Sequence, residues 1–351
     1  MKRWLLRLAG LLVLAAVVAA GAVRLAQREL VRPRQFTAVD LEVAPGQSAR
    51  TVLEQLERDG VVGSALLARL WLGRVRGDPA IHAGEYRFEP PLSAVDAIEM
   101  LVRGDVVTHP VTIVEGLTLH ETAAALAAAG FGDRERFIAE FSAPGRIADL
   151  DPQATHLEGY LQPDTYRFAR GTGEAAIADA LVAAFRARFE REIRPLLAGA
   201  PLATPRELVI LASLVEKEAR REEERPLIAA VYANRLARGI GLYADPTIIY
   251  GLKLEGRWDG NLRRRDLEAD SPWNTYRVAG LPPGPICSPG LASLRAAARP
   301  AEVPWLYFVS RNDGTHVFSA TLTEHNRNVE IWQRQYFRQR RAAAGGDGRA
   351  H

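Results

Sequence analysis

Two glutamates at the end of an apolar stretch are the residues best suited to acid–base chemistry in this chain. The stretch runs from Leu208 to Val215 without a charged residue, and Glu216 and Glu218 follow it. At 100° per residue the two carboxylates lie about 160° apart around a helix, so they cannot face the same cleft. Glu218 falls between two leucines in angle. Desolvation there would raise its pKa toward the range in which it exchanges protons near neutral pH.

The competing interpretation is that both acids are solvated where the helix emerges into the charged run Arg220 to Arg225. Spacing alone supports the two interpretations equally. The helix itself has a well-marked start, because Thr204 suits the N-cap, Pro205 suits the first helical position and Glu207 completes a capping box. Its apolar residues cover nearly every side, which predicts a helix packed inside a domain.

The N-terminal residues predict a membrane anchor. Sixteen uncharged residues run from Leu8 to Val23, and apolar residues beyond Arg7 and Arg24 extend them to about the length of a bilayer-spanning helix. A cleaved signal peptide is the rival, because Val18-Ala-Ala-Gly-Ala resembles a cleavage site. Basic residues before the apolar segment favour a cytoplasmic N-terminus, which places the body on the far side, the periplasm in a bacterium.

The length, charge and cysteine content of the chain limit the kinds of protein it can be. The length of 351 residues and the hydrophobic content of 48% suit two or three structural units. The net charge is +3, but residues 1–34 hold seven basic residues and one acidic residue, so they carry +6 and the remainder carries −3. A mildly acidic body gives no support to nucleic-acid binding. The single cysteine, Cys287, excludes a disulfide within the chain, and His120-Glu121 lacks the second histidine of a zinc motif, so no metal or cofactor is predicted.

The order of predicted elements indicates an α+β protein. Residues 36–90 read as strand, Pro-Gly turn, helix, helix and strand, which resembles a LysM-type module, a small fold that binds N-acetylated glycans. The predicted parts are a cytoplasmic stub 1–7, a transmembrane anchor 8–26, a connector 27–35, a LysM-like glycan-binding subdomain 36–109, a larger mixed α+β catalytic domain 110–340 and a disordered tail 341–351.

Two loop segments and one hairpin complete the predicted second domain. Residues 157–166 mix aromatic and acidic residues around a Pro-Asp turn, which suits a loop lining a polar cleft or a surface loop whose tyrosines pack on the core. Residues 271–290 form a long loop whose path several prolines fix. The sequence Asn312-Asp-Gly314 predicts a tight turn between strands 306–309 and 316–318.

Several of these blocks together resemble the YceG-like family of endolytic murein transglycosylases. The resemblance covers about residues 5–335, and the matching blocks are Glu158–Tyr166, Leu211–Ala219, Asn234–Leu236, Asp245–Gly251, Asn274–Tyr276, Gly280–Ile286, Ser288–Gly290, Tyr307–Phe308 and His325–Asn326. It implies a lyase that cleaves the β-1,4 bond between N-acetylmuramic acid and N-acetylglucosamine in nascent peptidoglycan and leaves a 1,6-anhydromuramyl end. It also implies an inner-membrane location with a periplasmic catalytic domain, a role in terminating glycan elongation, and penicillin-binding polymerases as partners.

The resemblance implies Glu218 as the catalytic residue, with Glu216 as the alternative. Ordinary glycosidases need two carboxyl groups, whereas a lytic transglycosylase can use one group first as acid on the glycosidic oxygen and then as base on the muramyl C6 hydroxyl. The supporting polar residues would be Tyr160, Asn234, Asp245 and Asn274, each of which could instead be a turn former or a core hydrogen bonder. The expected substrate-binding residues are Glu158, Gln162, Tyr166, Thr247, Tyr250 and Tyr276.

Two other functions fit the same sequence. One is a catalytically silent glycan-binding scaffold of cell-wall synthesis that uses the LysM-like module alone. The other is a two-carboxylate hydrolase in which Glu216 or Asp245 partners Glu218.

Overall fold

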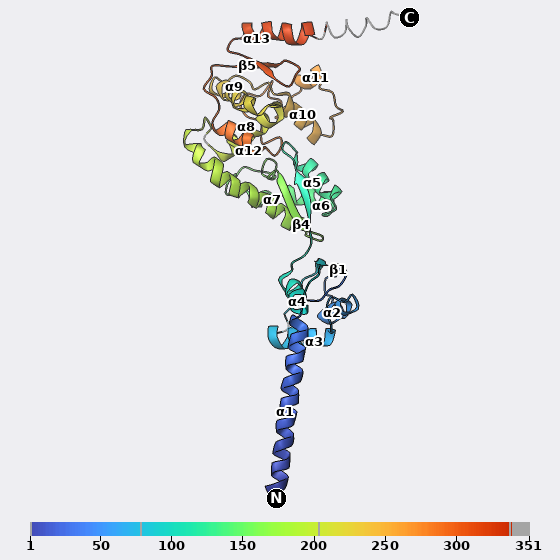
Figure 1. The fold of residues 1–351 in the computed structure, drawn as a ribbon. Helices are drawn as coiled ribbons and strands as arrows, with labels where there is room; N and C mark the ends of the chain where they lie inside the picture. The colour runs from blue at the N-terminus through green and yellow to red at the C-terminus, as the bar shows by residue number, and fades with distance from the viewer. Residues whose placement is uncertain (1, 78, 203, 337, 339–351) are drawn as a thin grey trace, which may run out of the picture. The chain divides into compact units, whose positions relative to one another are not determined.

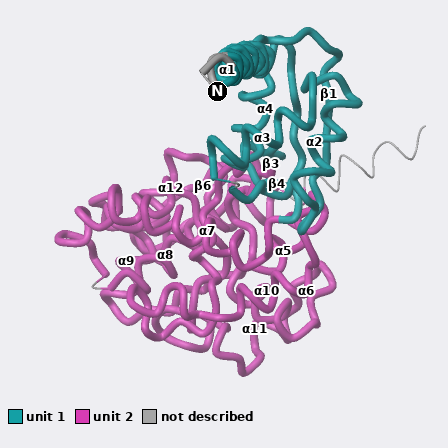
Figure 2. The backbone as a smooth tube through the Cα atoms, turned by 90° about the horizontal axis from the view of Figure 1, so that it is seen from below, with its two compact units in different colours: residues 1–110, 167–171 teal, residues 111–166, 172–351 magenta. Residues whose placement is uncertain are grey.

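The structure, a computed structural model, describes residues 2–338 except 78, 203 and 337. The chain divides into two compact units, residues 1–110 with 167–171 and residues 111–166 with 172–351 (Figure 2). The described residues form helices and three two-stranded sheets, so the α+β class is confirmed. The predicted disordered tail, 341–351, lies outside the described residues.

The first unit begins with one long helix, α1 (Lys2–Val31). Its segment Arg7–Val31 is long and apolar enough to cross a membrane, a property that signal sequences share. The helix runs further than the predicted anchor 8–26, because Gln27–Val31 continue it and Leu30 packs into the core of this unit. The first half of the predicted connector is therefore helical.

The rest of the first unit is a strand, two helices, a strand and a helix. Antiparallel pairing places Val39 opposite Phe88 and Leu41 opposite Tyr86. The predicted order of elements is confirmed, while the likeness to LysM stays a prediction. The elements are β1 (Val39–Val43), α2 (Ala49–Arg58), α3 (Ala65–Arg76), β2 (Gly84–Phe88) and α4 (Ala94–Arg103).

The second unit is mainly helical. Its first strand, β3 (Thr108–Ile113), pairs with β4 (Asp164–Ala169), and the division between the units passes through both strands. The other elements are α5 (Leu119–Ala128), α6 (Arg134–Phe141), α7 (Glu174–Arg188), α8 (Pro205–Glu218), α9 (Arg225–Ala237), α10 (Asp245–Leu254), α11 (Arg264–Leu267), α12 (Leu291–Ala298), β5 (Tyr307–Ser310), β6 (His316–Ser319) and α13 (Leu322–Val329), with short 3-10 or π turns at Pro144–Arg146, Phe189–Ile193, Arg194–Gly199, Glu222–Glu224 and Glu330–Gln335.

Strand β4 corrects one prediction, because residues 164–166 were expected to belong to a loop. The strand's side chains are exposed or half-buried along its whole length, so β4 has no fully buried face. Its pairing with β3 forms a ladder that the sequence pattern did not show.

Helix α8 is the central helix of the second unit. Thr204 and Glu207 form the predicted capping box at its start, each side chain accepting from the other's backbone N–H. Every residue from Leu208 to Val215 is buried. The helix packs against α9 and α12, which can be followed in Figure 1. Its C-terminal end, where the two acids lie, is thus fixed by a buried element.

Candidate functional site

Glu218 is the last residue of α8 and is half-buried. It forms no ion pair with any residue that the structure describes. Desolvation by the surrounding protein, and next the negative charge of Asp245, raise the pKa of Glu218 to about 7. A carboxyl group with that pKa is protonated and ionised in similar amounts at neutral pH, so it can both donate and accept a proton there.

The Tyr232 hydroxyl, on α9, lies close enough to this carboxylate to affect its pKa. It lowers the pKa of Glu218, while burial and then the charge of Glu218 raise the pKa of Tyr232 itself. The Tyr232 hydroxyl is buried, and it forms no hydrogen bond with any of the described residues.

Asp245, the second acid near Glu218, is the first residue of α10. It therefore lies at the positive end of the dipole of that helix. Its Oδ1 accepts a hydrogen bond from the Tyr276 hydroxyl at 2.7 Å. The predicted residues Glu218, Asp245 and Tyr276 therefore lie together, although they come from three separate segments of the chain.

Glu218 opens on a pocket of about 410 Å³, a size that suits a small part of a carbohydrate chain. Lys217 of α8 and Arg220, two residues after its end, line part of it, and the β5–β6 hairpin supplies the rest: Ser310, Asn312, Gly314 and His316. The His316 Nδ1 lies 2.7 Å from the Glu224 Oε2, and the His316 backbone N–H donates to the other Glu224 oxygen. Nδ1 therefore faces a carboxylate that holds the imidazole in place.

Glu216 has different surroundings from Glu218. Its Oε2 accepts from the Gly290 backbone N–H at 3.0 Å and from the Ser293 hydroxyl at 2.7 Å, and its Oε1 lies 3.2 Å from the Arg225 guanidinium. Only 7% of the side chain is exposed. These contacts cap the start of α12, and they engage both oxygens of the Glu216 carboxylate.

Glu158 is a second acid with a strongly raised pKa, and it is fully buried. Burial raises its pKa to about 8, and hydrogen bonds from the Leu119 backbone N–H and the Tyr250 hydroxyl oppose that rise. Glu158 thus joins the start of α5 to the middle of α10. Tyr250 is 3% exposed, so neither of these predicted substrate-binding residues has surface for a sugar to contact in this conformation.

The other predicted residues serve as hydrogen-bonding links within the second unit. Asn234 donates to the carbonyls of Val303 and Trp305, Asn274 to those of Leu267 and Ala269, Tyr160 to Asp151, Gln162 to the Pro163 carbonyl, Tyr166 to the Gln162 carbonyl and Thr247 to the Ala244 carbonyl. Tyr160, Gln162, Thr247 and Asn274 are buried. For Tyr160 and Asn274 the sequence left open the role of a core hydrogen bonder, whereas Gln162 and Thr247 were predicted to bind substrate.

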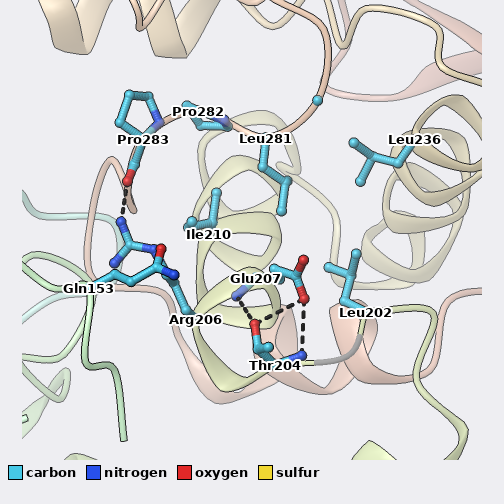
Figure 3. Close-up of a pocket in the computed structure, with 11 residues that line it drawn as sticks. Gln153, Leu202, Thr204, Arg206, Glu207, Ile210, Leu236, Leu281, Pro282 and Pro283 are labelled. Carbon is cyan, nitrogen blue, oxygen red and sulfur yellow. Dashed lines mark hydrogen bonds between the residues drawn. The ribbon is translucent and has the colours of Figure 1, made fainter. Parts of the chain in front are cut away.

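A pocket of about 510 Å³ lies at the opposite end of α8 and does not include Glu218 (Figure 3). Thr204, Arg206 and Glu207 line it, facing Leu281 and Pro283 of the proline-rich loop. Arg206 donates to the Pro283 carbonyl and to the Asp151 carboxylate, so its charge is already paired. This pocket contains neither Glu218 nor Glu216.

Sequence reasoning missed Tyr232 and His316 as site residues. A buried tyrosine hydroxyl normally has a partner, but nothing in one sequence says that Glu218 lies opposite it. His316 was placed correctly on a strand, yet its pairing with Glu224 joins residues far apart in the chain. Among the residues described, no three His, Cys, Asp or Glu side chains are grouped as metal ligands.

Comparisons with known proteins identify the family of the chain. The family described as YceG-like matches residues 41–331. The chain is 28% identical to an endolytic murein transglycosylase of Bacillus subtilis over 86% of this chain and 87% of that protein. It is 30% identical to one of Streptococcus pneumoniae (strain D39), covering 83% of this chain and 58% of the relative. A crystal structure of a YceG-like protein from Listeria monocytogenes has 30% identity and a TM-score of 0.56, covering 84% of this chain and 99% of that one.

Proposed function

Because the chain belongs to the YceG-like family, we propose that it acts as an endolytic murein transglycosylase on peptidoglycan. The bond cleaved is the β-1,4 link between N-acetylmuramic acid and N-acetylglucosamine inside a glycan strand, and the product carries a 1,6-anhydromuramyl end. The observation that carries the proposal is Glu218, an acid without an ion-pair partner among the described residues, with a pKa of about 7, at the edge of a polar pocket.

Glu218 would act twice in this reaction. Its protonated form donates to the glycosidic oxygen while the bond to the muramyl C1 breaks. The resulting carboxylate then takes the proton from the muramyl C6 hydroxyl, whose oxygen attacks C1 and closes the anhydro ring. No water is consumed, and the glutamate ends in its starting form.

The positive charge that develops at C1 needs stabilisation. The substrate's own acetamido group can supply part of it, and the Asp245 carboxylate, whose charge already acts on Glu218, is the protein group best placed for the rest. Tyr276 would hold Asp245 through its 2.7 Å hydrogen bond. Glu216 is left out of this scheme because its oxygens cap α12 and pair with Arg225.

Mass spectrometry of digested sacculi tests the proposal. Wild-type protein should release fragments that are lighter by one water than hydrolysis products, and Glu218→Gln should release none. Fragments with reducing ends would instead support a two-carboxylate hydrolase that uses Asp245.

The alternative is a glycan-binding scaffold without activity, and the strand, helix, helix, strand order of β1, α2, α3 and β2 favours it. Such a protein would sediment with sacculi and release nothing. An active wild type would exclude it.

The membrane helix and the cellular role form the last part of the proposal. Segment Arg7–Val31 would anchor the enzyme in the inner membrane, with its N-terminus in the cytoplasm and the catalytic domain in the periplasm. There it would cut strands that are still being polymerised near penicillin-binding proteins, and so terminate their elongation.

A further inference from the structure

Tyr243 has an unusual backbone conformation for its residue type. Its φ is 51°, and among the described residues only Asn312 is another non-glycine residue with positive φ. Asparagine adopts this region readily, whereas a bulky aromatic residue is disfavoured there. Such strain persists where surrounding contacts enforce it, and it is common at ligand sites.

The ring of Tyr243 is exposed but firmly held. The residue is 47% exposed, and a Cβ added at Gly241 would lie 3.0 Å from the Tyr243 Cε1, so the missing side chain of Gly241 makes room for the ring. The Arg235 guanidinium lies 5.4 Å from its centroid. Arg235 is itself fixed by hydrogen bonds to the Leu306 and Leu242 carbonyls.

A second exposed aromatic ring lies beside it. The Tyr243 and Tyr276 ring centroids are 5.2 Å apart, and Tyr276 is 36% exposed. The backbone N–H of Tyr243 donates to the Thr275 carbonyl, which ties the two segments together. The Tyr276 hydroxyl in turn donates to Asp245, whose charge acts on Glu218. Direct contacts therefore connect the two tyrosine rings to Asp245, the neighbour of Glu218.

We propose that Tyr243 and Tyr276 form an aromatic platform on which a pyranose ring of the glycan strand stacks, beside the sugar whose bond Glu218 protonates. The inference rests on the proposed function. The C–H face of a pyranose is apolar and packs on the electron-rich face of an aromatic ring. The Asp245 carboxylate and the Tyr276 hydroxyl at the rim accept hydrogen bonds from sugar hydroxyl or acetamido N–H groups.

The platform explains why a tyrosine stands at a strained position. Glycine or asparagine would adopt φ 51° at lower cost, and the exposed ring adds little to the core. A ring already held by Gly241, Arg235 and Tyr276 loses little freedom when a sugar binds. Preorganisation of this kind increases affinity without new contacts.

Binding of a soluble tetrasaccharide of alternating N-acetylglucosamine and N-acetylmuramic acid tests the platform. The full-length protein in detergent would carry Glu218→Gln, which prevents turnover, and calorimetry would measure affinity. Tyr243→Asn removes the ring while keeping a residue that tolerates positive φ, and we expect about tenfold weaker binding. Tyr243→Phe and Tyr243→Trp should bind like the parent. Leu254→Ala, which truncates another exposed apolar side chain on α10, is the matched control and should not change affinity.

In the active enzyme, Tyr243→Asn should raise KM by a similar factor and leave kcat nearly unchanged. Equal affinity of the parent and Tyr243→Asn would overturn the platform, and so would absence of tetrasaccharide binding by the parent, even if wild type still released anhydro products. Binding that depends on Tyr243 in a protein whose wild type releases no product would support the platform and contradict the proposed function.

Discussion

Glu216 and Glu218 are two residues apart on one helix, and their surroundings differ in kind. Glu216 caps α12 and pairs with Arg225. Glu218 has a raised pKa, an acidic neighbour and a pocket in front of it. Their angular separation follows from helix geometry alone and was predictable. Which of the two faced a pocket was not, because the answer depends on Gly290, Asp245 and the β5–β6 hairpin, all distant in sequence.

At the residue scale, the first prediction concerns the pH dependence of activity. The protonated form of Glu218 starts the reaction, so kcat/KM should fall as pH rises through about 7. The charge of Asp245 raises the pKa of Glu218, so Asp245→Asn should lower that pKa and move the fall to lower pH. A pH–rate profile of the two proteins checks this. If kcat/KM fell at the same pH in both proteins, the charge of Asp245 would not affect the pKa of Glu218.

The second prediction separates the two motif acids. Glu218→Gln should reduce the rate at least about 10³-fold, because it removes the proton donor. Glu216→Gln should keep most of the activity at low temperature, since its amide oxygen can still accept from Gly290 and Ser293. Fragment release from sacculi is the measurement. Loss of activity in Glu216→Gln with retained Glu218→Gln activity would reverse the assignment.

At the scale of elements, two buried acids join helices that are separate in the sequence. Glu216 links α8 to α12, and Glu158 links α5 to α10 through Tyr250. Capping boxes were predictable because both partners lie within four residues, as Thr204 and Glu207 do. The hydrogen bonds of Glu216 and Glu158 to other helices were not predictable, and neither was the pairing of strand β4. Each depends on residues brought together only by folding.

The third prediction concerns the α12 cap. Glu216→Ala removes the acceptor for the Gly290 N–H and deprives the largely buried Arg225 of its nearest carboxylate. We expect a loss of about 2–4 kcal/mol in the free energy of unfolding. Denaturant unfolding of the full chain in detergent measures it. Glu115→Ala, which removes the more distant acid near Arg225 at 4.0 Å, is the control and should cost much less.

The fourth prediction concerns Glu158. Its pKa is about 8 in the folded protein against 4.5 in an unfolded chain, so unfolding between pH 4.5 and about 8 releases a proton. Its contribution to stability is therefore fully present below pH 4.5 and is lost as pH rises through about 8, a change on the order of a few kcal/mol. Glu158→Gln should flatten this dependence when unfolding is followed from pH 5 to 9. A variant with the same pH dependence as wild type would contradict the assigned burial.

At the scale of the whole molecule, the chain combines a membrane helix candidate with two compact units. The α+β class and the apolar N-terminal helix were predictable from composition and periodicity, which are local properties of the sequence. The end of α1 was not, because Leu30 extends the helix by packing into the first unit's core. The pocket at Glu218 was also beyond sequence reasoning, since α8 and the hairpin that line it are about 90 residues apart.

The fifth prediction separates an anchor from a cleaved leader. If Arg7–Val31 stays attached, the mature protein should fractionate with membranes and retain residues 2–31 by intact mass. Deletion of residues 2–26, which keeps Leu30 in the core of the first unit, should release it to the soluble fraction without loss of activity on sacculi. A mature protein that begins near residue 23 and fractionates as soluble would identify a signal peptide instead.

Cleavage without water is the central claim, and digestion of sacculi in ¹⁸O-labelled water tests it most directly. The C6 hydroxyl of the sugar attacks C1 with Glu218 as acid and base, so the new muramyl ends should contain no ¹⁸O and should have the anhydro mass. Incorporation of one ¹⁸O atom at each new end would show that water attacks C1, and would contradict the account.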